Sequence, residues 1–175
     1  MAKNILTARE ANQKDIELIA DYWFTADEAY LKAMGIDTAK MPSRADFSAM
    51  LTTQFSLPYN QKKAYAIIWM ADDEPIGHSN LNPVEFGDHA YMHIHIWNTK
   101  YRRMGYGTEL IKLSLPYFFK NMALKKIYCQ PYALNPAPSK TLEKAGFKFV
   151  KEHTTKPGSI TFEQPVILWE IEQST

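Results

Sequence analysis

The sequence predicts an α/β domain built on a mixed β-sheet. Apolar runs of strand length alternate along the chain with amphipathic segments of helical period. No internal repeat, low-complexity tract or Pro/Gly/Ser-rich linker divides the chain. All 175 residues are therefore expected to form one domain, residues 1–175, large enough to bury a hydrophobic core.

The N-terminal part is expected to contribute one strand and two helices. The run ILTAR (5–9) has the composition of a strand, and QKDIELIADYWF (13–24) gathers its apolar residues on one helical face. Residues 25–42, interrupted by Gly35 and Pro42, are expected to be irregular. Ser43 and Asp46 then resemble a capping box, which predicts a second helix over about 46–55.

The remaining chain predicts three strands, a helix, a strand, a helix and two strands. The three strands are expected at KAYAIIWMA (63–71), near 77–81 and at HAYMHIHIW (89–97). A helix follows over about 108–122, and a strand lies in KKIYCQPY (125–132). The segment 135–146 predicts a short helix that ends at Gly146. The runs 147–153 and 166–172 are expected to pair as the closing strands.

Composition excludes several classes of protein. A formal net charge of +1, with no basic stripe, argues against a nucleic-acid partner. No apolar run approaches the ~18 residues of a membrane span, and the N-terminus lacks the apolar core of a signal peptide. Cys129 is the only cysteine, so no intrachain disulfide forms and a reducing compartment is indicated. We therefore expect a cytoplasmic protein, monomeric or homodimeric, without a membrane partner.

Two glycines stand between a strand and a helix in NTKYRRMGYGTEL (98–110). Such a junction forms an anion site, because backbone N–H groups point out of the loop and the helix dipole adds positive potential. A Rossmann loop would need a third glycine where Leu110 stands, and no Walker sequence is present. Arg102-x-x-Gly105-x-Gly107 remains, either as a phosphate loop or as a flexible turn.

The chain resembles the GNAT superfamily of acyl-CoA N-acyltransferases, whose phosphate loop reads [QR]-x-x-G-x-[GA] between a strand and a long helix. A second block, NPAPSKTLEKAGF (135–147), is similar to the family's N-x-x-[SA]-…-G-F segment. The residues of both blocks are most similar to those of the branch that includes the Rim-type acetyltransferases of ribosomal-protein N-termini. The resemblance implies a central, mostly antiparallel sheet of about six or seven strands flanked by about four helices.

The same resemblance implies acetyl-CoA as cosubstrate and no metal. Its pyrophosphate would be held by the backbone amides of the phosphate loop, and its pantetheine arm by the backbone at the end of strand 89–97 and by the residue that opens the second block. These residues are Arg102, Arg103, Met104, Gly105, Tyr106, Gly107 and Thr108 for the loop, Ile96 and Trp97 for the strand, and Asn135.

Two positions depart from the family pattern. Pro138 stands where Ser or Ala is usual, and Ser139 follows it. Leu142 stands where many members carry the tyrosine that protonates the leaving thiolate. Another donor is therefore needed, or the thiolate leaves unprotonated. Tyr132, close to Asn135, is the candidate donor, although it is also an ordinary residue for the end of a strand.

The strand 89–97 alternates between two kinds of side chain. His89, Tyr91, His93, His95 and Trp97 share one face, and the intervening residues are apolar. An exposed polar face on an edge strand is one explanation. Zinc binding is another, but no cysteine or acidic third ligand lies nearby. A catalytic face is the third, because this strand leads directly into the phosphate loop.

The third explanation fits acetyl transfer to an amine, whose ammonium form has a pKa of about 10 and must lose a proton. Histidine performs this proton transfer near neutral pH. By its offset from Arg102, His93 matches the position of the base in some family members, and Tyr91 matches another. His95 would replace His93 if a bulge shifted the strand.

We therefore expect an acetyl-CoA-dependent N-acetyltransferase whose acceptor is a small-molecule amine or a protein N-terminus. The competing hypothesis is an acyl-CoA-binding or sensing domain without catalysis. Leu142 favours that hypothesis and the histidine face opposes it.

Overall fold

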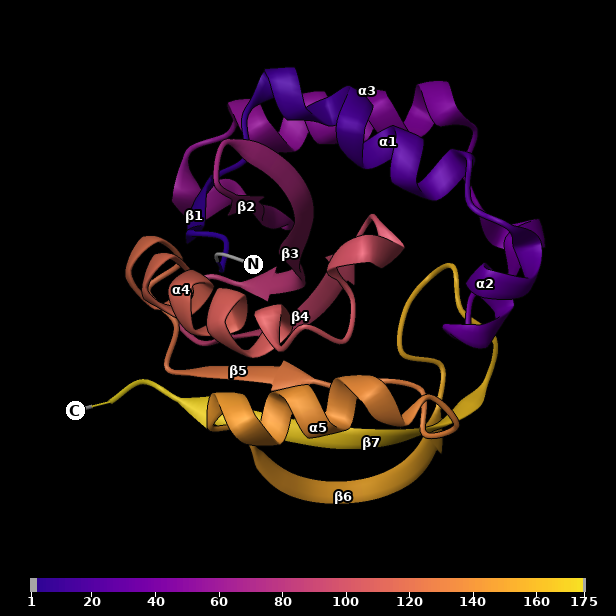
Figure 1. Cartoon of the computed structure of the whole chain (residues 1–175), viewed down its shortest axis with the longest axis vertical. Helices are drawn as coiled ribbons and strands as arrows, with labels where there is room; N and C mark the ends of the chain where they lie inside the picture. The colour runs from indigo at the N-terminus through magenta and orange to yellow at the C-terminus, as the bar shows by residue number, and fades with distance from the viewer. Residues whose placement is uncertain (1–2, 175) are drawn as a thin grey trace.

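The computed structural model describes residues 3–174, which form a seven-stranded sheet in the order β1-β2-β3-β4-β5-β7-β6. Figure 1 shows the strands crossing the molecule between two groups of helices. All neighbouring strands are antiparallel except β4 and β5, which are parallel. The strands are β1 (Leu6–Glu10), β2 (Tyr65–Ala71), β3 (Glu74–Glu85), β4 (His89–Ile96), β5 (Lys126–Cys129), β6 (Lys148–Thr155) and β7 (Gln164–Glu172).

Five α-helices accompany the sheet, one more than the sequence predicted. They are α1 (Ile16–Phe24), α2 (Glu28–Ala33), α3 (Arg44–Ser56), α4 (Tyr106–Asn121) and α5 (Pro136–Ala145). The helices α1 and α3 pack together, and α4 packs against β1 and α5. Short 3-10 turns lie at 13–15, 38–40, 59–61 and 99–101. No helix within residues 3–174 is both long and apolar enough to cross a membrane.

The extra helix lies in the segment expected to be irregular. Asp27 begins α2, because its carboxylate accepts a hydrogen bond from the N–H of Ala29 at 2.6 Å. Gly35 follows the helix with φ of +86°, a conformation that favours glycine. The predicted start of α3 is confirmed, since the Ser43 hydroxyl accepts from the N–H of Asp46 at 3.1 Å.

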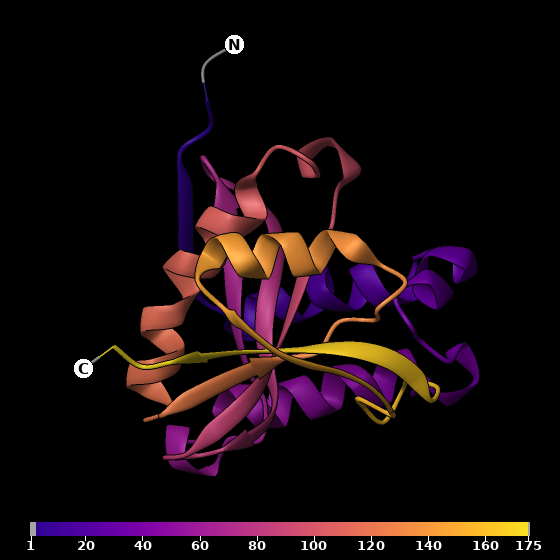
Figure 2. The same ribbon diagram turned by 90° about the horizontal axis from the view of Figure 1, so that it is seen from below.

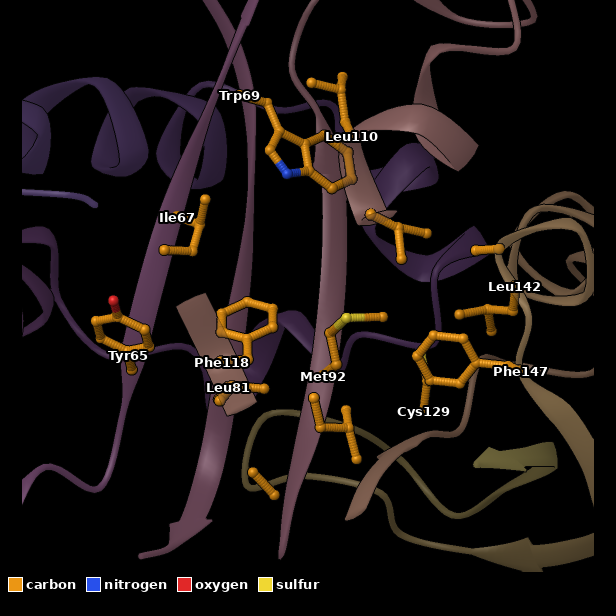
Figure 3. Close-up of a cluster of buried hydrophobic side chains, with 14 of the residues drawn as sticks. Tyr65, Ile67, Trp69, Leu81, Met92, Leu110, Phe118, Cys129, Leu142 and Phe147 are labelled. Atoms are coloured by element: carbon orange, nitrogen blue, oxygen red, sulfur yellow. The ribbon is translucent and has the colours of Figure 1, made fainter. Parts of the chain in front are cut away.

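The larger hydrophobic core lies between the sheet and the helices α4 and α5. Alternate residues of β2 point into it, and Met92 of β4 joins them (Figure 3). Phe118 of α4 and Leu142 of α5 are completely buried in this layer. Leu142, which replaces the tyrosine expected from the family, thus contributes to packing.

The opposite face of the sheet is covered by α1 and α3. Ile68 of β2 packs there with Ile16, Ile19 and Leu51, and Trp97 lies against the same cluster. The odd-numbered side chains of β4 belong to this face. These side chains are partly buried, and β4 is a central strand rather than the edge strand that one explanation required.

The two halves of the sheet separate between β4 and β5. Their parallel pairing ends at Tyr91 and Tyr128, and Figure 2 shows β5, β7 and β6 crossing the direction of β2, β3 and β4. The Trp97 N–H bonds to the carbonyl of Ile76 on β3. Because backbone groups alternate along a strand, those of Ile94 and Ile96 face the gap.

Candidate active site

A cleft of about 1000 Å³ opens where β4 and β5 separate. It is lined by the loop before α4, the start of α5, residues 92–96 of β4 and residues of α1, α2 and α3. Loop residues 157–161, between β6 and β7, complete the wall. The cleft therefore joins the predicted phosphate loop to the predicted catalytic strand.

The loop before α4 presents unpaired backbone donors to this cleft. Gly105 is the N-cap of α4 with φ of +79°, and no side chain caps the helix. Arg103 also has positive φ, +61°. Left-handed residues in this alternation form a concave nest of N–H groups that binds anions. A Cβ on Gly105 would meet no atom within 4 Å, so the space above the loop is open.

The start of α5 faces the same loop. A Cβ on Gly107 would lie 3.1 Å from Cγ2 of Thr141, so α4 and α5 approach closely at this point. Asn135 is the N-cap of α5, but its side chain makes no capping hydrogen bond. Its amide lines the cleft and is free to meet a ligand. The nest, the open space and Asn135 fit an extended phosphorylated cosubstrate.

Arg102 binds protein groups and spans the cleft from β4 to α2. Its Nη2 donates to the carbonyl of Ile96 at 2.9 Å and to the hydroxyl of Tyr30 at 2.8 Å. The guanidinium carbon also lies 4.6 Å from the centre of the Tyr30 ring. Arg102 therefore holds the end of β4 against α2, and its Nη2 is engaged by protein groups.

A chain of hydroxyl groups links Arg102 to His95. The hydroxyl of Tyr30 lies 3.1 Å from that of Tyr22, which lies 3.0 Å from Nδ1 of His95. His95 in turn stacks on His78 across the β3–β4 ladder, with ring centroids 4.8 Å apart. Three aromatic hydrogen-bonding residues from different elements therefore fix the orientation of the His95 imidazole.

His93 is oriented by an irregularity in β3. The bulge lies between Leu81 and Val84 of β3, so the alternation of β4 continues through His93 and His95. The displaced carbonyl of Asn82 accepts a hydrogen bond from Nε2 of His93 at 2.9 Å. Because a carbonyl only accepts, Nε2 carries the proton and Nδ1 has the free lone pair.

Burial lowers the pKa of all three histidines in the cleft. The pKa of His93 falls below its usual value through desolvation. The pKa of His95 falls further, first through desolvation and then because protonation would place its charge beside Arg102 and the neighbouring imidazoles of His78 and His93. Burial lowers the pKa of His78 to about 3. Its Nδ1 accepts from the indole N–H of Trp97 at 2.8 Å, as a neutral imidazole does. All three rings are therefore neutral at pH 7.

Other residues predicted for the site lie in different settings. Tyr91 does not line the cleft, and its ring packs against Tyr128 with centroids 5.3 Å apart. Tyr132 does line it, edge-on to Phe162. Met104 is half exposed outside the cleft, so only its backbone is near the loop site. Ser139 accepts a hydrogen bond from the indole of Trp169 at 3.2 Å.

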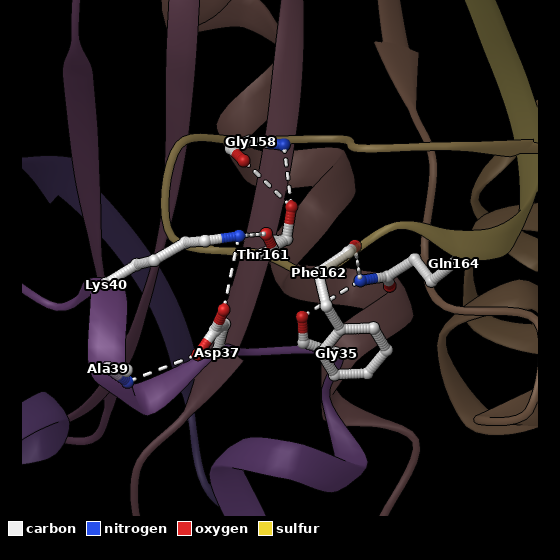
Figure 4. A network of polar contacts seen from close by, with 8 residues as sticks. All are labelled: Gly35, Asp37, Ala39, Lys40, Gly158, Thr161, Phe162 and Gln164. Atoms are coloured by element: carbon white, nitrogen blue, oxygen red, sulfur yellow. Dashed lines mark hydrogen bonds and ion pairs between the residues drawn. The ribbon is translucent and has the colours of Figure 1, made fainter.

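Polar contacts join two segments at one side of the cleft: the segment after α2 (35–40) and the loop before β7 (157–163). Asp37 N–H donates to the carbonyl of Ile160 at 2.8 Å, and Gln164 Nε2 donates to the carbonyl of Gly35 at 2.9 Å. Figure 4 shows these segments together with Lys40, whose Nζ bonds to the Thr161 carbonyl and pairs with Asp37. These contacts fix the wall on that side.

The remaining nucleophile in the cleft is Cys129. It is buried, and burial raises the pKa of its thiol to about 12. The thiol is therefore protonated at neutral pH and is a poor nucleophile. Among residues 3–174, no group of three or more His, Cys, Asp or Glu side chains is arranged to hold a metal ion.

Comparison with known families identifies this arrangement. The model of the family described as acetyltransferase (GNAT) domain matches residues 6–148. The chain belongs to this family. The match spans the phosphate loop, the histidine strand and α5. A search of curated proteins found no match.

Solved structures share the fold of this GNAT domain at low sequence identity. A spermidine N-acetyltransferase from Vibrio cholerae, in complex with CoA and spermine, has a TM-score of 0.76 and 19% identity, covering 96% of this chain and 95% of its own. Aminoglycoside acetyltransferase AAC(6')-Ib, in complex with CoA and kanamycin, has a TM-score of 0.71 and 19% identity. The match covers 97% of this chain and 95% of that enzyme. The ribosomal L7/L12 acetyltransferase RimL, in complex with CoA, has a TM-score of 0.74 and 12% identity. The match covers 95% of this chain and 93% of RimL.

The GNAT domain also contains site residues that sequence reasoning missed. Tyr22 and Tyr30 lie in segments without a motif, and His78 lies in a strand whose two faces the sequence did not distinguish. The antiparallel register places His78 opposite His95, and only the pairing of the two strands shows this. The approach of α1 and α2 to β4 has no sequence signature.

Proposed function

We propose that this GNAT protein is an acetyl-CoA-dependent N-acetyltransferase that acts on a primary amine with general-base assistance from a histidine of β4. One observation carries the proposal: a single cleft joins an uncapped helix N-terminus, suited to a pyrophosphate, to a face of neutral histidines. An acyl-CoA sensor would need the first feature and has no use for the second.

The cosubstrate site is assigned to the loop before α4, Ile96 and Asn135. Amides of residues 103–108 hold the pyrophosphate, and the backbone of β4 that faces the gap pairs with the pantetheine arm. Acetyl-CoA supplies the acyl group as a thioester when it is bound. The N–H of Trp97 already bonds to β3, so Ile96 is the more suitable backbone partner. Arg102 must release the Ile96 carbonyl or share it.

His93 is assigned as the base. Its Nδ1 lone pair accepts the proton of the acceptor amine, directly or through water, while the Asn82 carbonyl holds the Nε2 proton and keeps the ring in place. His95 is the second candidate, although Tyr22 already occupies its Nδ1. Tyr91 lies outside the cleft and is the weakest of the three.

The leaving thiolate requires either a proton donor or direct departure. Leu142 is buried and has no proton to give. Tyr132 in the cleft is the proposed donor, and Tyr30, whose hydroxyl accepts from Arg102, is a second cleft tyrosine with a proton available. A thiol with a pKa near 8.5 also leaves readily without help.

Four further proposals rest on the sequence alone. They are membership of the Rim-type branch, a single domain over 1–175, a cytoplasmic location and a monomeric or homodimeric state. The branch would imply a protein N-terminus as acceptor, whereas other GNAT proteins with the same fold were solved with small amines.

The test measures CoA release from acetyl-CoA with a panel of amines and peptides. Replacing a general base typically costs 10²–10⁴ in rate. His93→Ala is expected to lower kcat/KM at least about a hundredfold with the affinity for acetyl-CoA nearly unchanged. In the wild type, the acid limb of the pH profile should lie below 6.5, because burial lowers the pKa of His93. If His93→Ala and His95→Ala both retain the wild-type rate and profile, the histidines are not catalytic.

A further inference from the structure

The charges around the cleft point to the chemical class of the acceptor. Within residues 3–174, no aspartate or glutamate lines the cleft, and its charged residues are Lys40, Arg102 and Arg103. The three histidines beside them are neutral, and each would add positive charge if protonated. The cleft therefore offers no anion to pair with a cationic substrate.

The acidic residues at the start of α2 and just after it are engaged elsewhere. Asp27 caps α2, and Glu28 pairs with Lys32 at 2.8 Å. Asp37 caps the turn at 38–40 and pairs with Lys40. Each of these three carboxylates has a structural partner, and none of them lines the cleft.

The side of the cleft formed by residues 19–55 is apolar, and we assign it to the acceptor because the loop before α4, Ile96 and Asn135 are assigned to the cosubstrate. Apart from Tyr30 and Lys40, every residue that lines the cleft from the segment 19–55 is aliphatic, aromatic or proline. Trp23 and Phe47 supply aromatic rings to this wall, and Met50 of α3 is exposed at its edge. Such a wall gains free energy by covering apolar surface and offers few partners for polar groups.

We infer that the acceptor is a small hydrophobic monoamine: one amino group on an alkyl or aromatic body without a second cationic group. This inference rests on the proposed function and narrows it. An ammonium that enters this side of the cleft loses hydration that no carboxylate there replaces. A polyamine or an aminoglycoside brings several such groups, whereas a monoamine brings only the group that His93 deprotonates.

The joined wall also favours a small body over a polypeptide. Ile36 and Thr161 form a β-bridge, so the segment after α2 and the loop before β7 are continuous on that side. A peptide would also bring backbone N–H and C=O groups against the apolar side chains of residues 19–55, where they would lose their hydrogen bonds to water.

The test compares hexylamine with hexane-1,6-diamine, which has the same chain and one additional ammonium. Steady-state kcat/KM with acetyl-CoA is expected to be at least about tenfold higher for hexylamine. 2-Phenylethylamine should likewise exceed spermidine and kanamycin, and a short peptide with a free N-terminus should be slower than either monoamine.

Adding a carboxylate to the side of the cleft formed by residues 19–55 tests whether the absence of carboxylates there causes the preference for a monoamine. Met50 is 41% exposed, so Met50→Glu places a carboxylate at the edge of the cleft without a large burial cost, and Met50→Gln is its uncharged control. Met50→Glu should reduce the preference for hexylamine over the diamine, and Met50→Gln should leave it unchanged. An equal preference in wild type and both variants would show that the missing carboxylates do not set it.

The outcomes separate this inference from the function on which it rests. Equal or faster acetylation of the diamine, spermidine or kanamycin overturns the monoamine inference and leaves the acetyltransferase intact. Preferred acetylation of the peptide overturns it in favour of a protein N-terminus. Binding of acetyl-CoA without acetylation of any amine or peptide overturns the proposed function, and the inference with it.

Discussion

Replacing Gly105 tests the phosphate loop, because this residue combines a left-handed backbone with open space above it. Its φ is +79°, and a β-branched residue is strongly disfavoured there. Holding an L-residue in this conformation costs roughly 1–2 kcal/mol. In Gly105→Val the loop either pays this cost to keep its amides converging or relaxes and loses the nest. The new side chain also occupies the space that phosphate oxygens need.

These effects predict that Gly105→Val binds acetyl-CoA at least about tenfold more weakly, which corresponds to about 1.4 kcal/mol. Isothermal titration calorimetry measures the affinity, and circular dichroism confirms folding. Gly87 is a matched control, since its φ is also +79° and a Cβ there meets nothing within 4 Å, but it lies in the β3–β4 turn and does not line the cleft. Gly87→Val should lose similar stability and keep full affinity. A folded Gly105→Val with unchanged affinity would place the phosphates elsewhere.

Two further results are expected. Tyr132→Phe should lower kcat without changing acetyl-CoA affinity if Tyr132 protonates the thiolate, and full turnover in a stopped-flow or steady-state assay would remove it as donor. The unfolding free energy should fall as pH drops below 6.5, because unfolded chains bind protons that the buried histidines do not. With the pKa of His78 at about 3, the loss from this residue between pH 7 and 5 is about 2 kcal/mol. Urea titrations of His78→Asn should show a correspondingly smaller loss of unfolding free energy between pH 7 and 5. An identical pH dependence in the wild type and the variant would show that the pKa of His78 is not lowered in the folded protein.

Local sequence determined the order of the main elements and the glycine-containing loop that begins α4. Ser43 begins α3 and Gly146 ends α5, as predicted, because caps and left-handed turns depend on a few adjacent residues. The alternation of β4 also persists in the structure. Where local signals were weak the prediction was wrong: α2 was missed because its start depends on a single capping carboxylate, Asp27, in a segment with two chain breakers.

Tertiary structure decided which of the residues around the cleft contact one another. Tyr22, Tyr30 and Arg102 reach His95 only because α1 and α2 fold over β4, and pairings across more than 70 residues leave no local pattern. The bulge that gives the Asn82 carbonyl to His93 lies on β3, although the sequence raised the possibility of one in β4. The sequence by itself thus predicted a phosphate loop, and it identified the strand that carries the alternating histidines. The long-range packing around them decided which nitrogen is free, which charges are paired and which walls are apolar, since these depend on contacts between distant segments.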